Sequence, residues 1–132
     1  MLDLIDRARN SKLVLDLAGI TFINSIGVRE WIRMQQAAAK IGVSIELRRV
    51  CEPLVHQLNI VPATRGVSMV TSFFAPYECA NCDVEHDVVL DVRIHGAALA
   101  KMQAPAMPCP DCRGPLVFTA PPELYFTFLT AG

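Results

Sequence analysis

The chain has 132 residues and a formal net charge of −1, with 52% apolar and 19% charged residues. This balance is that of a globular protein with a buried core, and it excludes a disordered chain or a general attraction to nucleic acid or acidic lipid. No uncharged run reaches the roughly 20 apolar residues that span a bilayer. The acidic residues in the opening MLDLID do not fit a secretory signal. We therefore expect a cytoplasmic protein, in a compartment where paired cysteines favour metal over disulfide.

The two parts of the chain differ in charge. Residues 1–76 hold nine Lys and Arg against six Asp and Glu, whereas residues 77–132 hold three against seven. The length fits one domain or a small domain with an appendage. We predict a first domain over residues 1–75, a second module over residues 76–132, and a joint at Ala75–Pro76.

The first half opens with alternating helix and strand signals. A short amphipathic pattern over 2–9 predicts a helix, and the apolar run 13–17 predicts a buried strand. Asn24 and Ser25 are residue types that cap the start of a helix. Apolar residues then recur at helical spacing until Gly42, a typical C-terminal stop. We expect a long helix here, with Trp31 in the core.

The same alternation continues to residue 74. Residues 43–47 alternate apolar and polar side chains, which predicts a half-buried strand. Pro53 suits the first turn of a short helix that runs to Ile60, and 67–74 is a further strand candidate. The order of elements predicts an α/β fold with a small, mostly parallel sheet covered by helices.

Two motifs in this half resemble the core of the STAS domain, the fold of bacterial anti-sigma-factor antagonists and stressosome subunits. They are the strand motif Val14-Leu15-Asp16-Leu17 and the loop motif Phe22-Ile23-Asn24-Ser25-Ile26-Gly27, followed by the long helix. The resemblance covers roughly residues 1–75. Asn24 stands where the family usually has Asp, and the strands that usually open the family's fold have no counterpart. Either the reading frame is truncated, or a dimer or larger assembly covers the exposed sheet edge.

The resemblance implies a regulatory site. In the family, the serine after the acidic residue is phosphorylated by a kinase that is also an anti-sigma factor, and Ser25 occupies that place. A phosphate there would meet free N–H groups at the positive end of the helix. The family's partner surface implies contacts through Asn24, Ser25, Arg29 and Arg33, with the kinase or with other STAS proteins. The alternatives are plain capping by Asn24 or Ser25 and an ordinary solvated helix face.

The second part carries a four-cysteine pattern. Cys79-x2-Cys82 and Cys109-x2-Cys112 are separated by 26 residues. Two such turns at strand ends can hold one Zn²⁺ tetrahedrally, with no open ligand position, so we expect a structural zinc site in a C-terminal β-type zinc ribbon. Two unrelated cysteine pairs, two disulfides and a thiol redox switch are the alternatives. His86, four residues after Cys82, could replace a cysteine ligand, but four thiols already complete the site. We therefore expect His86 and His95 to be solvated strand residues.

The charge of the second part indicates whether a zinc ribbon here would bind nucleic acid or protein. Its formal charge of −4 (three minus seven) lacks the cations that neutralise phosphates, which favours a protein partner over nucleic acid. No catalytic motif is found, so we expect no enzyme. We expect the aromatic group Tyr125, Phe126 and Phe128 to pack on the ribbon or on the first domain.

The sequence thus favours a non-enzymatic signalling or scaffold protein, homo-oligomeric and acting through protein contacts. A nucleic-acid-binding adaptor and a thiol redox sensor are the alternatives.

Overall fold

The computed structural model describes residues 12–20, 24–66 and 68–129. The helix predicted over 2–9 and two residues of the loop motif, Phe22 and Ile23, lie outside the described residues. None of the helices in the described ranges combines the length and the apolar character needed to cross a bilayer.

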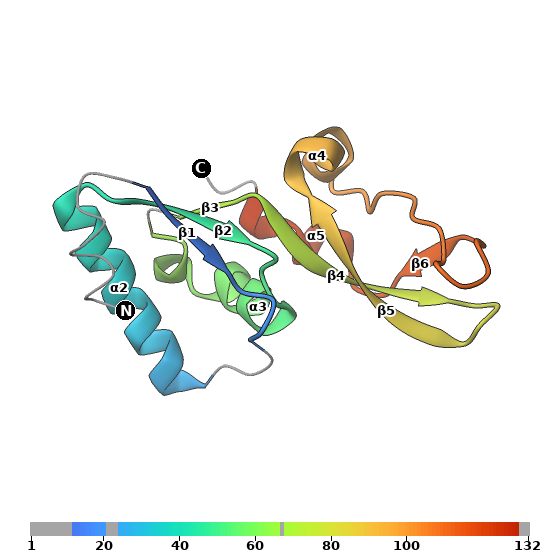
Figure 1. Cartoon of the computed structure of the whole chain (residues 1–132), viewed down its shortest axis with the longest axis horizontal. Helices are drawn as coiled ribbons and strands as arrows, with labels where there is room; N and C mark the ends of the chain where they lie inside the picture. Colours follow the sequence, from blue (N-terminus) through green and yellow to red (C-terminus); the bar gives the residue numbers. More distant parts are fainter. Residues whose placement is uncertain (1–11, 21–23, 67, 130–132) are drawn as a thin grey trace.

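The described residues form a mixed α/β structure with two small sheets (Figure 1). The strands are β1 (Lys12–Asp16), β2 (Ser44–Arg48), β3 (Ser68–Val70), β4 (Ser72–Cys79), β5 (Val84–Asp91) and β6 (Leu116–Phe118). The helices are α2 (Ser25–Ile41), α3 (Glu52–Ile60), α4 (Val92–Ala100) and α5 (Pro122–Tyr125), with 3-10 turns η1 (Pro62–Thr64) and η2 (Thr127–Leu129).

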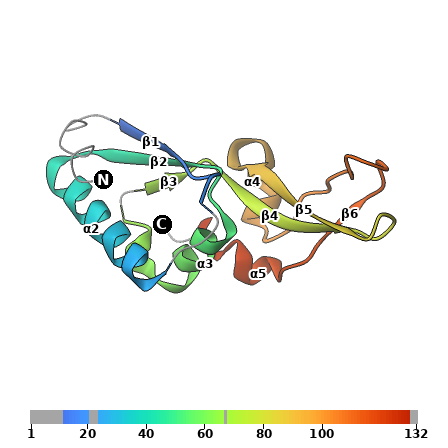
Figure 2. The ribbon, with the colours of Figure 1, turned by 60° about the horizontal axis from the view of Figure 1, so that its bottom comes forward.

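The first sheet is parallel, in the order β1-β2-β3, which confirms the predicted small parallel sheet. Helices α2 and α3 lie on the same side of it (Figure 2). Ile45 and Leu47 of β2 are buried, as expected for the central strand of a parallel sheet. On its other side, Glu46 lies between Lys12, at 2.6 Å, and Arg48. Hydrogen bonds from Lys12 and Arg48 lower the pKa of Glu46 to about 2, so this side of the sheet is charged.

Helix α2 begins and ends where the sequence predicts. The side chain of Asn24 accepts a hydrogen bond from the Gly27 N–H at 2.8 Å, which satisfies one of the free amides of the first turn. Gly42 ends the helix with φ 74°, a left-handed conformation that glycine adopts without strain. Trp31 is buried, as predicted, and its indole N–H donates to the Thr64 carbonyl at 2.8 Å.

The strand predicted over residues 67–74 is divided into two strands, β3 and β4, because the chain changes sheets at Thr71. The Thr71 N–H donates to the Leu47 carbonyl at 2.9 Å, and its own carbonyl accepts from Val92 at 3.0 Å. Strand β3 before it joins the first sheet, and β4 after it is the centre of the second. Strand β4 then continues through Ala75 and Pro76, so it crosses the predicted joint. The division of the chain into two domains stays a prediction.

The second sheet is antiparallel, in the order β5-β4-β6. Four buried side chains alternate along β4 on one side: Phe73, Ala75, Tyr77 and Cys79. Strand β5 ends at Asp91, whose carboxylate accepts hydrogen bonds from the N–H groups of Arg93 and Ile94 and so caps α4. His95 therefore lies in a helix, and the prediction that it is a strand residue is wrong.

The C-terminal residues connect the two sheets. Five rings pack together near the start of β4, and we call them the aromatic cluster: Phe73, Phe118, Tyr125, Phe126 and Phe128. On α3, Asn59 donates to the Tyr125 carbonyl at 2.9 Å and accepts from the Phe128 N–H at 2.7 Å. The expectation that the C-terminal aromatic side chains pack against the rest of the protein is confirmed.

Candidate metal centre

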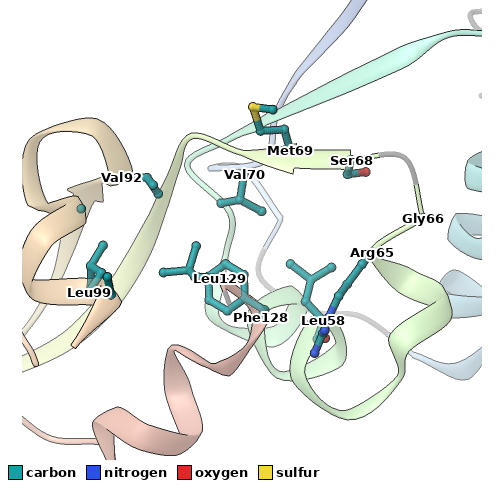
Figure 3. Close-up of a pocket in the computed structure, with 12 residues that line it drawn as sticks. Leu58, Arg65, Gly66, Ser68, Met69, Val70, Val92, Leu99, Phe128 and Leu129 are labelled. Carbon is teal, nitrogen blue, oxygen red and sulfur yellow. The ribbon is translucent and has the colours of Figure 1, made fainter. Parts of the chain in front are cut away.

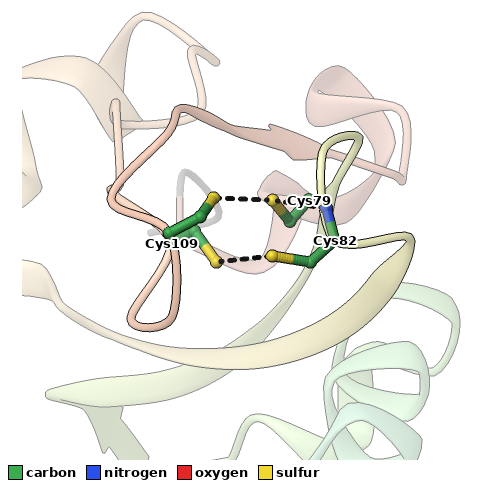
Figure 4. Close-up of side chains that lie close together, drawn as sticks. Cys79, Cys82 and Cys109 are labelled. Carbon is green, nitrogen blue, oxygen red and sulfur yellow. Dashed lines mark hydrogen bonds between the residues drawn. The ribbon is translucent and has the colours of Figure 1, made fainter.

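The four cysteines predicted as ligands lie together at the tip of the second sheet. Cys79 ends β4, Cys82 lies in the turn before β5, and Cys109 and Cys112 lie in the loop before β6. Two of the sulfur–sulfur distances are 3.5 Å, between Cys79 and Cys112, and 3.9 Å, between Cys82 and Cys109 (Figure 4). All four sulfur atoms lie within 4.8 Å of one another and could together hold a metal ion. We call them the sulfur cluster.

The two cysteine pairs sit on turns of the same shape. The Asp83 N–H donates to the Cys79 carbonyl at 2.8 Å, and the Arg113 N–H donates to the Cys109 carbonyl at 2.9 Å. Both donors have left-handed backbones, with φ 54° at Asp83 and 61° at Arg113. Each turn therefore closes in the same way, and it brings the two sulfur atoms of its pair to the same side.

Gly114 in the second turn is required by close packing around the cysteines. The left-handed residue is Arg113, whereas Gly114 is needed because a Cβ there would lie 2.8 Å from Nδ2 of Asn81 and 3.3 Å from Sγ of Cys112. The absence of a side chain also lets the Gly114 N–H reach Sγ of Cys112 at 3.4 Å. Close approach of backbone to sulfur, and not an unusual φ, is the reason for the glycine.

Two thiols of the sulfur cluster, those of Cys112 and Cys82, have very different pKa values. The hydrogen bond from Gly114 lowers the pKa of Cys112 to about 7. The neighbouring sulfur atoms of Cys112 and Cys79 raise the pKa of Cys82 to about 12. Because thiolates are the metal-binding form, a bound cation would displace the remaining protons.

His86, four residues after Cys82, lies beside the sulfur cluster. Its Nε2 lies 3.8 Å from Sγ of Cys109, and His86, Cys109 and Asp111 form a second overlapping group of donor atoms. His86 is half-buried on β5, as a strand residue should be, where it pairs with Tyr77. The register of β4 and β5 brings it next to Cys109, which belongs to the other cysteine pair.

We call the described residues between 12 and 70, which include the first sheet, the first region, and those between 72 and 129, which include the second sheet, the second region. The residues predicted to bind a partner lie apart from the sulfur cluster, on α2 of the first region (Figure 1). Asn24, Ser25, Arg29 and Arg33 are all exposed. Arg33 forms an ion pair with Glu30 at 3.1 Å, one turn of the helix away. Asn24 provides the cap, and in the described residues the Ser25 side chain has no hydrogen-bond partner.

A polar cleft of about 310 Å³ lies between α3 and β5. Burial and the neighbouring carboxyl group of Asp87 raise the pKa of Glu52 to about 7. Glu52 comes from the first region and Asp87 from the second, so only the folded structure brings these acidic groups together. His56 lines the same cleft and meets the ring of Tyr125 edge-on at 5.9 Å.

Comparison of the chain with protein-family models, with curated proteins and with solved structures gives no match.

Proposed function

We propose that this chain is a non-enzymatic, cytoplasmic bacterial signalling or scaffold protein that acts through protein contacts. In this proposal the first region is a STAS-like module, similar to an anti-sigma-factor antagonist, and the second is a zinc ribbon. Cys79, Cys82, Cys109 and Cys112 hold a structural Zn²⁺, and α2 carries the partner surface.

The geometry of the sulfur cluster is the observation that carries the proposal. Four sulfur atoms arranged tetrahedrally at 2.3 Å from Zn²⁺ would lie about 3.8 Å apart. The distances of 3.5 Å and 3.9 Å lie on either side of this value. Four thiolates leave no position for a substrate or water, so the ion would hold the two cysteine turns together and supply no Lewis-acid chemistry.

The exposure of Ser25 supports a regulated partner surface. Because Asn24 already caps α2, the Ser25 hydroxyl is not needed to satisfy the first turn. A phosphate on Ser25 would lie at the positive end of a 17-residue helix, close to its free amides. We infer that a kinase that is also an anti-sigma factor, or another STAS protein, contacts Asn24, Ser25, Arg29 and Arg33.

The edge of the first sheet supports a homo-oligomer. The Leu17 N–H donates to the Arg48 carbonyl at 3.0 Å, so alternate backbone groups of β1, those of Lys12, Val14 and Asp16, face away from β2. In the described part of the chain no strand pairs with this edge. A second copy would satisfy these groups.

The experiment that tests the proposal is metal content measured with native mass, on protein purified without chelator. We expect one zinc per chain in a dimer or larger species. Metal-free protein whose thiols oxidise reversibly would reject the zinc ribbon in favour of a redox sensor. Salt-sensitive retention on heparin together with a DNA or RNA shift would reject the protein-contact function in favour of a nucleic-acid adaptor.

The partner surface has its own test. A phosphate mimic, Ser25→Glu, and the neutral Ser25→Ala are compared as baits for an anti-sigma-factor kinase, with Gln36→Ala on the same helix as the control. We expect Ser25→Glu to lose capture at least tenfold while both alanine variants keep it. Equal capture by Ser25→Glu and the control would remove Ser25 from the contact.

A further inference from the structure

A largely apolar hollow of about 710 Å³ lies between β3, α4 and η2 (Figure 3). Its volume is within the roughly 300–1,000 Å³ of small-molecule sites. The apolar part of the wall comes from both regions of the protein: Leu58, Val70, Val92, Leu99, Phe128 and Leu129. The hollow is distinct from the sulfur cluster and from the exposed face of α2.

The guanidinium of Arg65 brings positive charge to this apolar wall. Its Nε donates to the Leu58 carbonyl at 2.7 Å, which fixes the side chain along the wall. In the described ranges its two terminal nitrogens have no acceptor. A planar guanidinium with free N–H groups is suited to a carboxylate.

A backbone donor lies on the same wall. The Thr71 N–H bonds to the Leu47 carbonyl, so Val70, one residue earlier, turns its backbone groups away from β2. Because β3 is the edge of the first sheet, the Val70 N–H has no strand partner among the described residues. One charged donor and one backbone donor thus accompany a wall of apolar side chains.

We propose that this hollow binds a small apolar carboxylate of the medium-chain fatty acid class. The hydrocarbon chain lies against the apolar wall, and the carboxylate accepts hydrogen bonds from Arg65 and from the Val70 N–H. A polyanion such as a nucleotide is disfavoured, because Arg65 is the one cation among the described residues that line the hollow. A peptide strand is also disfavoured, because β3 has three residues and offers too short an edge for strand addition.

The protein contains its own reporter of binding. Trp31 is the single tryptophan of the chain, and its indole bonds to the carbonyl of Thr64, directly before Arg65. A ligand held by Arg65 is therefore expected to change the fluorescence of Trp31.

The experiment is a titration of the full chain with decanoate, and separately with decanol, each kept below its aggregation concentration and followed by Trp31 fluorescence. We expect saturable binding of decanoate, at least tenfold tighter than that of decanol. Arg65→Met should reduce decanoate binding to the level of decanol while keeping decanol binding, which shows that the variant is folded. The exposed Arg33→Met on α2 is the matched control and should bind as the parent does.

A second variant tests the position of the ligand. Gly96 on α4 lines the hollow, and a Cβ there meets nothing within 4 Å, so Gly96→Leu fills the space without strain. We expect it to abolish saturation by both ligands, whereas Ala97→Leu, one residue away and exposed, leaves both unchanged.

Three results of these titrations would overturn the proposal. They are the absence of saturation by decanoate, equal affinity for decanoate in the parent and Arg65→Met, and unchanged binding by Gly96→Leu. Tighter saturation by an apolar tetrapeptide with a free C-terminal carboxylate would overturn it in favour of a peptide partner. None of these results depends on metal at the sulfur cluster.

Discussion

The two sheets are held together by different means. In the first, apolar side chains of the parallel strands pack beneath α2 and α3, with Leu47 and Ala38 fully buried. At the tip of the second sheet, Cys79 and Cys109 are buried instead, and a long loop between α4 and β6 is joined by the short bridge of Pro108 with Pro115. The first region is therefore stabilised by hydrophobic packing, whereas the tip of the second brings together four cysteines that could hold a metal ion.

The aromatic cluster lies between these two kinds of structure. Phe73 is fully buried, and its ring centre lies 5.2 Å from that of Phe128 and 6.0 Å from that of Phe126. Because this packing is hydrophobic, like that of the first sheet, we expect it to survive changes at the cysteines of the tip.

The largest expected effect is a change at the cysteines that unfolds the tip of the second sheet and leaves the rest of the protein folded. Cys109→Ser removes a ligand, and since structural zinc contributes about 10–16 kcal/mol in small zinc-finger peptides, we expect loss of the metal and local unfolding of the tip. Metal analysis and hydrogen exchange check this, with protection lost over residues 79–83 and 109–118 and retained on α2.

Cys51→Ala is the matched control for this prediction. Cys51 is the fifth cysteine, buried at the start of α3 away from the cluster, and burial raises the pKa of its thiol. The control should keep one metal per chain. Loss of protection on α2 in Cys109→Ser would show that the first region also depends on the metal.

The next effect tests the connection between the regions. Phe73→Ala leaves a cavity at the centre of the aromatic cluster and should lower the free energy of unfolding by about 3–5 kcal/mol. Phe74→Ala, the half-buried neighbour on the other face of β4, should cost less than half as much. Chemical denaturation measures both. Equal costs would contradict the assignment of Phe73 to the centre of the contact.

A smaller effect is expected at the N-terminal cap of α2 in the first region. Asn24→Ala removes the cap of α2 and should cost about 1 kcal/mol, whereas Ser25→Ala should stay within about 0.5 kcal/mol of the parent. Thermal unfolding followed by circular dichroism is sufficient. A Ser25→Ala cost equal to that of Asn24→Ala would assign the cap to both residues and weaken the case for a free hydroxyl.

The smallest effect concerns the polar cleft between the regions. Folding raises the pKa of Glu52 from 4.5 to about 7, because burial and Asp87 disfavour its charge. The folded protein therefore binds this proton more tightly than the unfolded chain does, and stability decreases as the pH rises from 4.5 to about 7. We expect Glu52→Gln to have the same melting temperature as the parent at pH 4. At pH 8 its melting temperature should be one to a few degrees higher than that of the parent.

The exposed Glu123→Gln is the control for this pH dependence, because it lies on α5 outside the cleft. Comparing each variant with the parent at the same pH cancels contributions from other groups. A Glu52→Gln difference that is constant between pH 4 and pH 8 would contradict the shifted pKa.

Local signals explain what the sequence could predict. The start and end of α2 follow from Asn24 and Gly42, each of which acts on backbone groups within one turn. The cysteine turns follow from spacing, since two residues between cysteines are enough to bring two sulfur atoms to one side. The predicted α/β character and parallel first sheet needed only the order of these local elements.

Distant pairings explain what the sequence missed. The change of sheet at Thr71 depends on Leu47 and Val92, which contact it from both sides. Helix α4 begins with β-branched residues and contains Gly96, both of which disfavour a helix prediction, and only the capping carboxylate of Asp91 indicates its start. The spacing of His86 from Cys82 is visible in the sequence, but its contact with Cys109 of the other pair depends on the strand register.

The alternating row along β4 also limits how the sequence can change length. Phe73, Ala75, Tyr77 and Cys79 share one side of the strand, so the aromatic cluster and the sulfur cluster are separated by a whole number of two-residue repeats. A single inserted or deleted residue between them would turn either the ring or the thiol to the opposite side. In natural variants of this chain, gains and losses of residues should therefore fall in the loop before β6, while the interval from Phe73 to Cys79 keeps its length.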